Sequence, residues 1–391
     1  MAGPVIRRRL TCQQRQPGSS TTVVAEGAAL ATADLPHVEV PTDEALVRRL
    51  IAAQFPRWAE LPVVRTRSWG TDNAMYRLGD DKVVRLPRFA RWAPQVDREH
   101  RWLPRLAPHL PLTVPVPLAL GQPAEGYPFR WSVCPWLDGE NPARGGGPDP
   151  DRLARDVAGF IRALRRIDPT GGPAPDASNA FRGVPVGDSR PSLATDGNLR
   201  RRIAALSGLV DTDALAAVWD AALAAVPAWD GRGGWIHGDL AAGNLLTVDG
   251  RLRAAIDFGC LAVGDPACDL MVAWTLLPAG SRAVFRAALE VDDASWARGR
   301  GWGMAMRVPA PEDFSAADPD RAAYARRIVA EFVADHRQPG SGTEQAGDEQ
   351  AGAEEAGAEE AGDEQAGTEQ AGDEQAGDRS RSRLSGESPT A

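Results

Sequence analysis

One short segment constrains the fold more than any other part of the chain, because it places three oxygen-bearing side chains around a predicted β-hairpin. It reads IHGDLAAGNLL from residue 236 and continues to IDFG at 256–259. Between these motifs, two short β-like runs are joined by Asp249-Gly250, a dipeptide typical of tight hairpin turns. A hairpin brings its two ends together, so Asn244 and Asp257 are expected to face one point in space.

These side chains have the chemistry that phosphoryl transfer requires. An amide oxygen from Asn244 and a carboxylate from Asp257, with water and phosphate oxygens, form the coordination that Mg²⁺ prefers. Asp239 is then left to receive a proton from an attacking hydroxyl. Protein kinases use this arrangement, with a loop that reads H-R-D-x-x-x-x-N and a second aspartate that begins D-F-G. Each residue also has a structural interpretation: Asp239 as a helix cap, Asn244 as support for a turn, and Asp257 as the end of a strand.

The pattern of apolar residues predicts an α+β protein with two lobes. In the first lobe, at 41–137, a helix is expected after Pro41, where Thr42 and Asp43 are good caps. A second helix is expected at 94–109, with Pro104 ending or kinking its first part. The β-like runs of this lobe are 62–68, 74–79, 82–87, 113–120 and 130–134. The first lobe is therefore expected to be a small antiparallel sheet with one helix inserted into it.

The second lobe, at 138–336, is expected to be larger and mainly helical. It begins with a stretch that contains Gly145-Gly146-Gly147, which is typical of a boundary between lobes. Apolar residues then recur at helical spacing. The helices are expected at 151–167, 196–209, 211–226, 265–277, 281–290 and 319–336, with the hairpin strands at 244–248 and 252–257.

Both ends of the chain have the composition of disordered segments. Residues 1–40 lack periodicity and are interpreted as a leader, and 337–391 as a tail built on a five-residue AGxEx repeat. Positions 343–378 hold thirteen acidic and no basic residues. Because the formal charge of the whole chain is −9, the rest of it carries a net charge of +4. The acidic balance therefore belongs to the tail and not to a domain that would repel phosphate.

The amino-acid sequence of the central segment resembles the corresponding motifs of the aminoglycoside phosphotransferase family of small-molecule kinases. Gly238 stands where protein kinases have arginine, and GDPACDL follows at 264–270. The likeness covers roughly residues 41–336. The resemblance implies a bilobal protein-kinase-like fold, ATP or sometimes GTP as phosphoryl donor, Mg²⁺, and a small-molecule hydroxyl as acceptor.

The resemblance also assigns roles to residues of the second lobe. Asp239 would be the catalytic base, and Asn244 and Asp257 the metal ligands. His237 would organise the loop, and Asp269 matches a family position that supports the catalytic loop from the following helix.

The first lobe must then supply the nucleotide site. Gly70, in the loop that joins two predicted strands, is expected to lie over the phosphates, although an ordinary hairpin turn explains it equally well. The run VVRL at 83–86 resembles the kinase strand that carries the phosphate-contacting lysine, and here Arg85 takes that place. An arginine fork can hold two phosphate oxygens. Glu99, on the next helix, is the natural ion-pair partner of Arg85, the alternative being a solvated helix face.

The segment RWSVCPWL at 130–137 resembles the hinge whose backbone recognises adenine. Cys134 and Trp136 are therefore expected to contact the nucleotide through backbone groups, with interlobe packing as the other interpretation of Trp136. After Ala294, the string GRGWG at 299–303 and the prolines that follow are expected to break the helix that completes the acceptor pocket.

We expect an ATP-dependent small-molecule phosphotransferase, with an aminoglycoside antibiotic as the default acceptor. Macrolides, amino alcohols and sugars are alternative acceptors. An acidic rim for a polycation could come from Asp138, Glu140, Asp149 and Asp151, which could equally be a solvated face. A non-catalytic, nucleotide-binding pseudokinase is the alternative from another class, favoured by the altered stretch at 299–312.

Other classes of protein fit the sequence less well. The modest charge outside the tail and the absence of a basic stripe with interleaved aromatics speak against nucleic-acid binding. No stretch approaches the roughly 20 apolar residues of a membrane span. Four scattered cysteines without CxxC spacing favour a reducing cytoplasm. Oligomeric state is left open.

Overall fold

The computed structural model describes residues 38–66, 72–143 and 148–337. Gly70 and most of the predicted leader and tail lie outside the described residues. Two residues assigned to the leader belong to the folded part, however. The backbone N–H of Val40 donates to the carbonyl of Arg88 at 2.8 Å, and the Glu39 carboxylate pairs with the Arg88 guanidinium at 2.8 Å.

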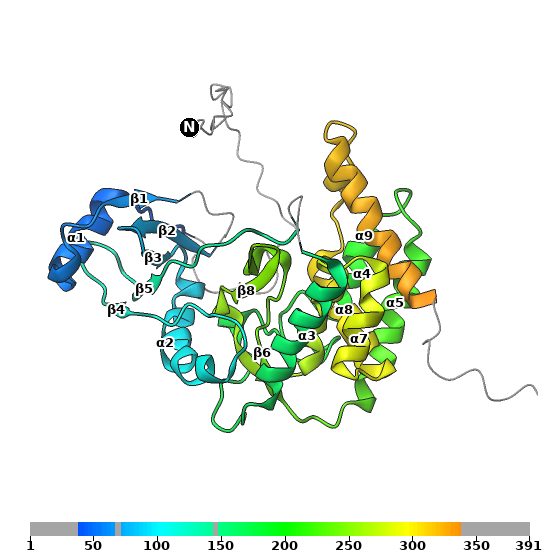
Figure 1. The fold of residues 1–391 in the computed structure, drawn as a ribbon. Helices are drawn as coiled ribbons and strands as arrows, with labels where there is room; N and C mark the ends of the chain where they lie inside the picture. The colour runs from blue at the N-terminus through cyan, green and yellow to red at the C-terminus, as the bar shows by residue number, and fades with distance from the viewer. Residues whose placement is uncertain (1–37, 67–71, 144–147, 338–391) are drawn as a thin grey trace, which may run out of the picture. The chain divides into compact units, whose positions relative to one another are not determined.

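The first lobe is an antiparallel five-stranded sheet in the order β1-β2-β3-β5-β4 (Figure 1). Its strands are β1 (Val63–Arg65), β2 (Asn73–Leu78), β3 (Lys82–Pro87), β4 (Ala119–Gly121) and β5 (Trp131–Pro135). Helix α1 (Glu44–Gln54) is capped by Asp43, whose carboxylate accepts from the N–H of Leu46 at 2.7 Å. Leu50 and Ile51 of α1 share one apolar core with the sheet.

Helix α2 (Pro94–Leu106) lies between β3 and β4 in the chain, but its apolar side belongs to the core of the second lobe. Trp102, Leu103 and Leu106 are buried there. Pro104 lies inside the helix, so the helix does not end there as one form of the prediction expected. The helix continues for two more residues because Leu103 and Leu106 pack into the core on either side of the proline.

The predicted strand at 113–120 is only partly in the sheet. Its last residues form β4, whereas Thr113 pairs with a strand of the second lobe. The N–H of Thr113 donates to the carbonyl of Arg253 at 2.9 Å, and its carbonyl accepts from the N–H of Ala255 at 3.1 Å. The segment that follows α2 is thus attached to the second lobe by backbone hydrogen bonds.

The second lobe combines helices with two short antiparallel ribbons. Its helices are α3 (Pro150–Arg166), α4 (Asp196–Ala204), α5 (Thr212–Ala224), α6 (Val272–Thr275), α7 (Ala279–Leu289), α8 (Asp293–Arg307) and α9 (Pro319–Arg337). The predicted hairpin forms as β7 (Leu245–Val248) and β8 (Arg251–Ala255). The ribbon of β6 (Gly234–Ile236) and β9 (Ala262–Gly264) is not predicted. Within the described residues, no helix is long and apolar enough to cross a membrane.

Helix α8 corrects the expectation that the glycines at 299–303 break a helix. It runs without interruption from Asp293 to Arg307, and the prolines follow its end. A Cβ at Gly299 would lie 2.5 Å from the Cβ of Leu270, and one at Gly301 would lie 2.6 Å from the Cβ of Ala222. Close packing therefore requires glycine on this helix, and the burial that it permits outweighs the low helix propensity of glycine.

This packing predicts opposite effects of two helical Gly→Ala substitutions. Gly301→Ala should destabilise the protein by about 1–3 kcal/mol, because the new methyl group overpacks the contact with α5. The matched control is Gly159→Ala in α3, where a Cβ meets nothing within 4 Å. The control should stabilise by about 0.5–1 kcal/mol, and urea unfolding of both variants measures the difference. Equal effects would contradict the packing role of Gly301.

Candidate active site

Arg85 joins the sheet, helix α2 and the loop after β8. It lies on β3 and is 7% exposed, and Glu99 of α2 is 2% exposed. Nη1 of Arg85 donates to both carboxylate oxygens of Glu99, at 2.8 and 2.7 Å, and Nη2 donates to Oδ1 of Asp257 at 3.0 Å. Burial acts to lower the pKa of Arg85, but the two carboxylates outweigh it and raise that pKa. The solvated-face alternative for Glu99 does not hold in this structure.

Asp257 has an unusual backbone conformation at the end of the hairpin. Its φ is 65° and its ψ is 66°, in the left-handed region that non-glycine residues seldom adopt. Phe258, the next residue, is buried, with its ring centroid 4.5 Å from that of His237 and 6.4 Å from that of Phe160. This anchoring turns the chain sharply and leaves the Asp257 side chain 39% exposed beside Arg85.

His237, Asp239 and Asn244 form a connected loop that is tied to the end of β8. Nδ1 of His237 accepts from the N–H of Asp239 at 3.2 Å, so Nε2 carries the ring proton and donates to the carbonyl of Ile256 at 3.0 Å. Nδ2 of Asn244 donates to the carbonyl of Asp239 at 2.8 Å and to its Oδ2 at 3.2 Å. The N–H of Ile256 donates to the carbonyl of Asn244 at 2.9 Å. The two ends of the hairpin are thus adjacent, and Oδ1 of Asn244 is left as an acceptor.

The second residue of the loop must be glycine. Gly238 has a φ of +79°, and a Cβ there would lie 2.5 Å from the carbonyl oxygen of Cys260. The buried carboxylate of Asp269 accepts from the N–H of His237 at 2.7 Å and from that of Gly238 at 2.8 Å. Burial raises the pKa of Asp269, although these contacts act in the opposite direction. Asp269 thereby holds the backbone of the loop at His237 and Gly238.

Arg182 is a residue of the site that sequence reasoning missed. Its Nη1 donates to Oδ1 of Asp239 and to the carbonyl of Gly238, both at 2.8 Å. Burial would raise the pKa of Asp239, but the Arg182 guanidinium outweighs it, so that pKa lies below its usual value. Arg182 lies in a loop rich in proline and glycine, where no periodicity or motif marks it.

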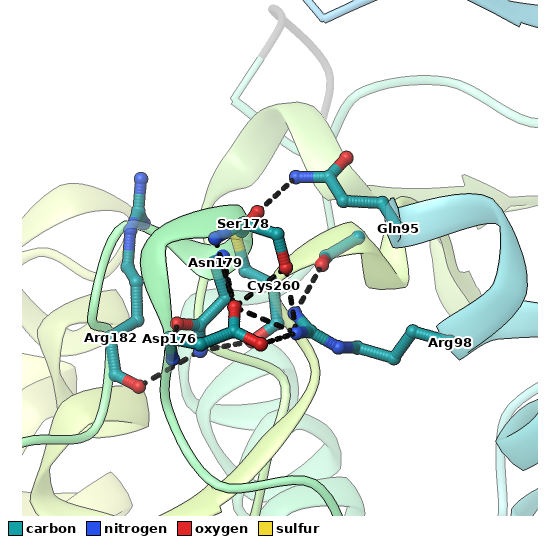
Figure 2. A network of polar contacts seen from close by, with 8 residues as sticks. Gln95, Arg98, Asp176, Ser178, Asn179, Arg182 and Cys260 are labelled. Atoms are coloured by element: carbon teal, nitrogen blue, oxygen red, sulfur yellow. Dashed lines mark hydrogen bonds and ion pairs between the residues drawn. The ribbon is translucent and has the colours of Figure 1, made fainter. Parts of the chain in front are cut away.

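The segment that carries Arg182 is also bonded to helix α2 (Figure 2). Nη2 of Arg98 donates to both carboxylate oxygens of Asp176, at 3.0 and 2.9 Å, and to Oγ of Ser178 at 2.8 Å. Nη1 of Arg98 donates to the carbonyl of Gly259 at 3.2 Å. Gln95, one turn earlier on α2, donates to the carbonyl of Ser178 at 2.9 Å.

The other end of this segment is bonded to the loop after Asp257. Nδ2 of Asn179 donates to the carbonyl of Cys260 at 3.3 Å and to that of Arg182 at 3.0 Å. Asp176 and Asn179 also cap each other in a short turn. Residues 176–182, which we call the 176–182 bridge, therefore connect α2 with the carboxylate of Asp239.

The predicted hinge residues have other partners in the structure. Cys134 is fully buried on β5, and burial raises the pKa of its thiol to about 12. The N–H of Trp136 donates to the carbonyl of Asp81 at 2.8 Å, and its indole donates to Asp138 at 2.8 Å under the guanidinium of Arg77. The backbone N–H of Trp136 is thus engaged within the first lobe, and its ring packs against Arg77 of β2.

The donor set at the hairpin ends suits Mg²⁺ bound mainly through substrate. In the part of the chain that the structure describes, no three His, Cys, Asp or Glu side chains gather in a group that could hold a metal. Asn244 and Asp257 offer two oxygen ligands on adjacent strand ends. Mg²⁺ typically takes one or two such ligands and completes its shell with phosphate oxygens and water.

The sheet with its single ion-paired helix, followed by this loop and hairpin, defines a protein-kinase-like fold. A model of the phosphotransferase enzyme family (APH) matches residues 63–302, and the chain belongs to this family. The GDP complex of aminoglycoside 2'-phosphotransferase-IIIa is 20% identical, with a TM-score of 0.54, and the match covers 75% of this chain and 100% of that one. The GDP and kanamycin complex of APH(2")-IIIa is 22% identical, with a TM-score of 0.52, over 74% and 98% of the two chains. At this identity the likeness establishes the shared fold. No curated protein matches the sequence.

The 176–182 bridge predicts that Arg98 stabilises the protein. Arg98→Met should cost about 2 kcal/mol of unfolding free energy, because charge-assisted hydrogen bonds to Asp176, Ser178 and Gly259 are lost. The control is Arg101→Met on the exposed side of the same helix, which should change stability by less than about 0.5 kcal/mol. Denaturant unfolding compares the two, and equal losses would show that the bridge contributes nothing specific.

Proposed function

We propose that this protein transfers the γ-phosphoryl group of ATP, or of GTP, to a hydroxyl group of a small molecule. One observation carries the proposal, which is an unbroken series of contacts through the site. Arg85 is paired with Glu99 and also bonds Asp257. Ile256, the residue before Asp257, bonds the backbone of Asn244, and the Asn244 amide bonds Asp239. A phosphate-binding cation, two metal ligands and a base are thereby connected through successive contacts.

The nucleotide side of the site would work through fixed charges. Arg85 would hold phosphate oxygens, with Glu99 keeping the guanidinium in place. Oδ1 of Asn244 and the Asp257 carboxylate would hold Mg²⁺, which neutralises developing charge on the phosphates when bound. Cys134 and its neighbours on the hinge would lie against the base of the nucleotide, and Gly70 would lie over its phosphates.

The acceptor side would work through Asp239. The acceptor oxygen forms a bond to the γ-phosphorus while the bond from that phosphorus to the bridging oxygen of ADP breaks. The hydroxyl proton passes to the Asp239 carboxylate, which its lowered pKa keeps ionised at neutral pH. His237 and Asp269 would position the loop, since their contacts are to its backbone.

The pseudokinase alternative loses the observation that favoured it. The glycines at 299–303 do not break the helix, since α8 is continuous to Arg307 and ends only before Pro309 and Pro311. An aminoglycoside acceptor rests on the family resemblance and on the names of neighbouring structures. The cysteines described by the structure are free and buried, in keeping with the cytoplasm that we propose as the location.

The base assignment predicts a loss of turnover in Asp239→Asn. A general base contributes about 10² to 10⁴ in rate, so kcat should fall by roughly that factor while nucleotide affinity changes little. The matched control is Asp249→Asn in the nearby hairpin turn, where Asn tolerates the positive φ. ADP release over a panel of hydroxyl compounds measures both variants. Turnover of an acceptor by Asp239→Asn at the wild-type rate would remove Asp239 from the mechanism.

The metal assignment predicts a change in nucleotide binding. ATP should raise the melting temperature more with Mg²⁺ than with EDTA, by mass action on the folded state. Asp257→Asn keeps a side chain that tolerates left-handed backbone but removes the charge, so most of the Mg²⁺-dependent part should disappear. Asp249→Asn again serves as the control. An undiminished dependence on Mg²⁺ in Asp257→Asn would contradict its role as a ligand.

A further inference from the structure

Arg182 approaches the predicted base from the interior of the second lobe. The side chain of Arg182 is 13% exposed and that of Asp239 is 30% exposed. Nη1 of Arg182 donates to Oδ1 of Asp239 at 2.8 Å, whereas Nδ2 of Asn244 donates to Oδ2 at 3.2 Å. The bond from Arg182 is the shorter one and joins opposite charges, so it is the stronger of the two. It holds a carboxylate that remains partly open to solvent.

The loop that carries Asp239 supplies no cation for this carboxylate. Residues 239–244 read DLAAGN and contain neither lysine nor arginine. The terminal torsion of an aspartate side chain has a broad energy profile, so its carboxylate turns easily unless a partner fixes it. Among the described residues, the ion pair of Asp239 is with Arg182, and this pair therefore sets the plane of the carboxylate.

The backbone immediately before Arg182 is strained. Ala180 and Phe181 both have a φ of 53°, in the left-handed region. A residue with a Cβ is unfavourable in that region, and two such residues in succession are uncommon. Proteins keep a conformation of this kind where the surrounding structure enforces it, and such positions gather at functional sites. Here the strained turn leads directly into the arginine that contacts the base.

Contacts on both sides of the arginine enforce this conformation. Before it, the N–H of Phe181 donates to the carbonyl of Asp176 at 2.8 Å. After it, the carbonyl of Gly183 accepts from the N–H of Asp265 at 2.7 Å. A Cβ at Gly183 would lie 2.4 Å from Cδ1 of Ile236, the last residue of β6, so the backbone lies directly against that strand. Because β6 leads into the predicted catalytic loop, the arginine and the base are held on one framework.

Resting on the proposed phosphotransferase function, we propose that Arg182 positions the Asp239 carboxylate to receive the proton of the acceptor hydroxyl. Arg182 keeps its own protons, and the bond changes are those of the proposed reaction. Its other hydrogen bond, to the carbonyl of Gly238, fixes the guanidinium against the backbone of the same loop. A carboxylate held in one orientation needs no reorientation at the moment of reaction, and a misplacement of about 1 Å can cost about 10² in rate.

The test is a double-mutant cycle in the full chain, measured as ADP release with ATP, Mg²⁺ and a panel of sugars, amino alcohols, aminoglycosides and macrolides. Its variants are Arg182→Met, Asp239→Asn and both together. Arg182→Lys keeps the buried charge, and it replaces Arg182→Met in the cycle should the latter fail to fold. Arg190→Met is the matched control, because Arg190 lies in the same loop and pairs with Asp188 instead of the site. Crystal structures of wild type and of the Arg182 variants show where the Asp239 side chain lies.

Arg182→Met should lower kcat about 10²-fold, with KM for ATP and for the acceptor within about threefold of wild type, because orientation and not binding is lost. Arg182→Lys should recover part of kcat, since lysine keeps the charge but not the planar fork. In the Asp239→Asn background, Arg182→Met should change kcat less than about threefold, because residues that act as a unit are not additive. Arg190→Met should match wild type. The Asp239 carboxylate should leave its wild-type plane in the crystal structure of Arg182→Met.

The proposal is overturned if Arg182→Met lowers kcat by the same factor with and without the Asp239 carboxylate, or leaves kcat at the wild-type value. A rise in KM with unchanged kcat would assign Arg182 to substrate binding instead. No ADP release by wild type with any compound would contradict the proposed function, and the crystal structures then decide the positioning role. An Asp239 side chain that moves in Arg182→Met supports that role, and one that stays in place overturns it.

Discussion

The buried ion pair between Arg85 and Glu99 is the contact on which the arrangement of the site depends. Both side chains are almost fully enclosed, and removing one partner of such a pair typically costs about 3–5 kcal/mol. Because Arg85 also bonds Asp257, the pair determines where the sheet, helix α2 and the hairpin end lie relative to one another. Two carboxylates around one guanidinium leave a net negative charge at this point.

Helix α2 is held from its other side as well. Its apolar residues are buried in the core of the second lobe, and Arg98 bonds the 176–182 bridge. One helix therefore places Glu99 against Arg85 and is connected through the bridge to Arg182 and Asp239. In protein kinases the position of the corresponding helix controls activity. Here the contacts that hold it are made by unmodified side chains of the same chain.

Gly238 of the loop and Gly259 after Asp257 are required because other parts of the chain approach their backbone closely. At Gly259, a Cβ would collide with the amide of Gln95 on α2, and at Gly238 it would meet the carbonyl of Cys260. Both glycines thus permit the loop, the segment after Asp257 and α2 to come together. Gly299 and Gly301 serve α8 in the same way, so a string that reads as a helix breaker is a packing surface.

The sequence by itself determined the elements whose cause is local. The hairpin turn at Asp249-Gly250, the cap at Asp43 and strand β3 follow from hydrogen bonds and side-chain patterns within a few residues. Asn244 and Ile256, the neighbour of Asp257, adjoin because they are the two ends of a hairpin, and Asn244 bonds Asp239 within one short loop. Only the tertiary structure decided the features that depend on contacts between residues far apart in the chain. Arg182 reaches Asp239 across 57 residues of chain, the three-residue strands β6 and β9 are too short to show alternation, and the α8 glycines are helical because of the side chains packed against them.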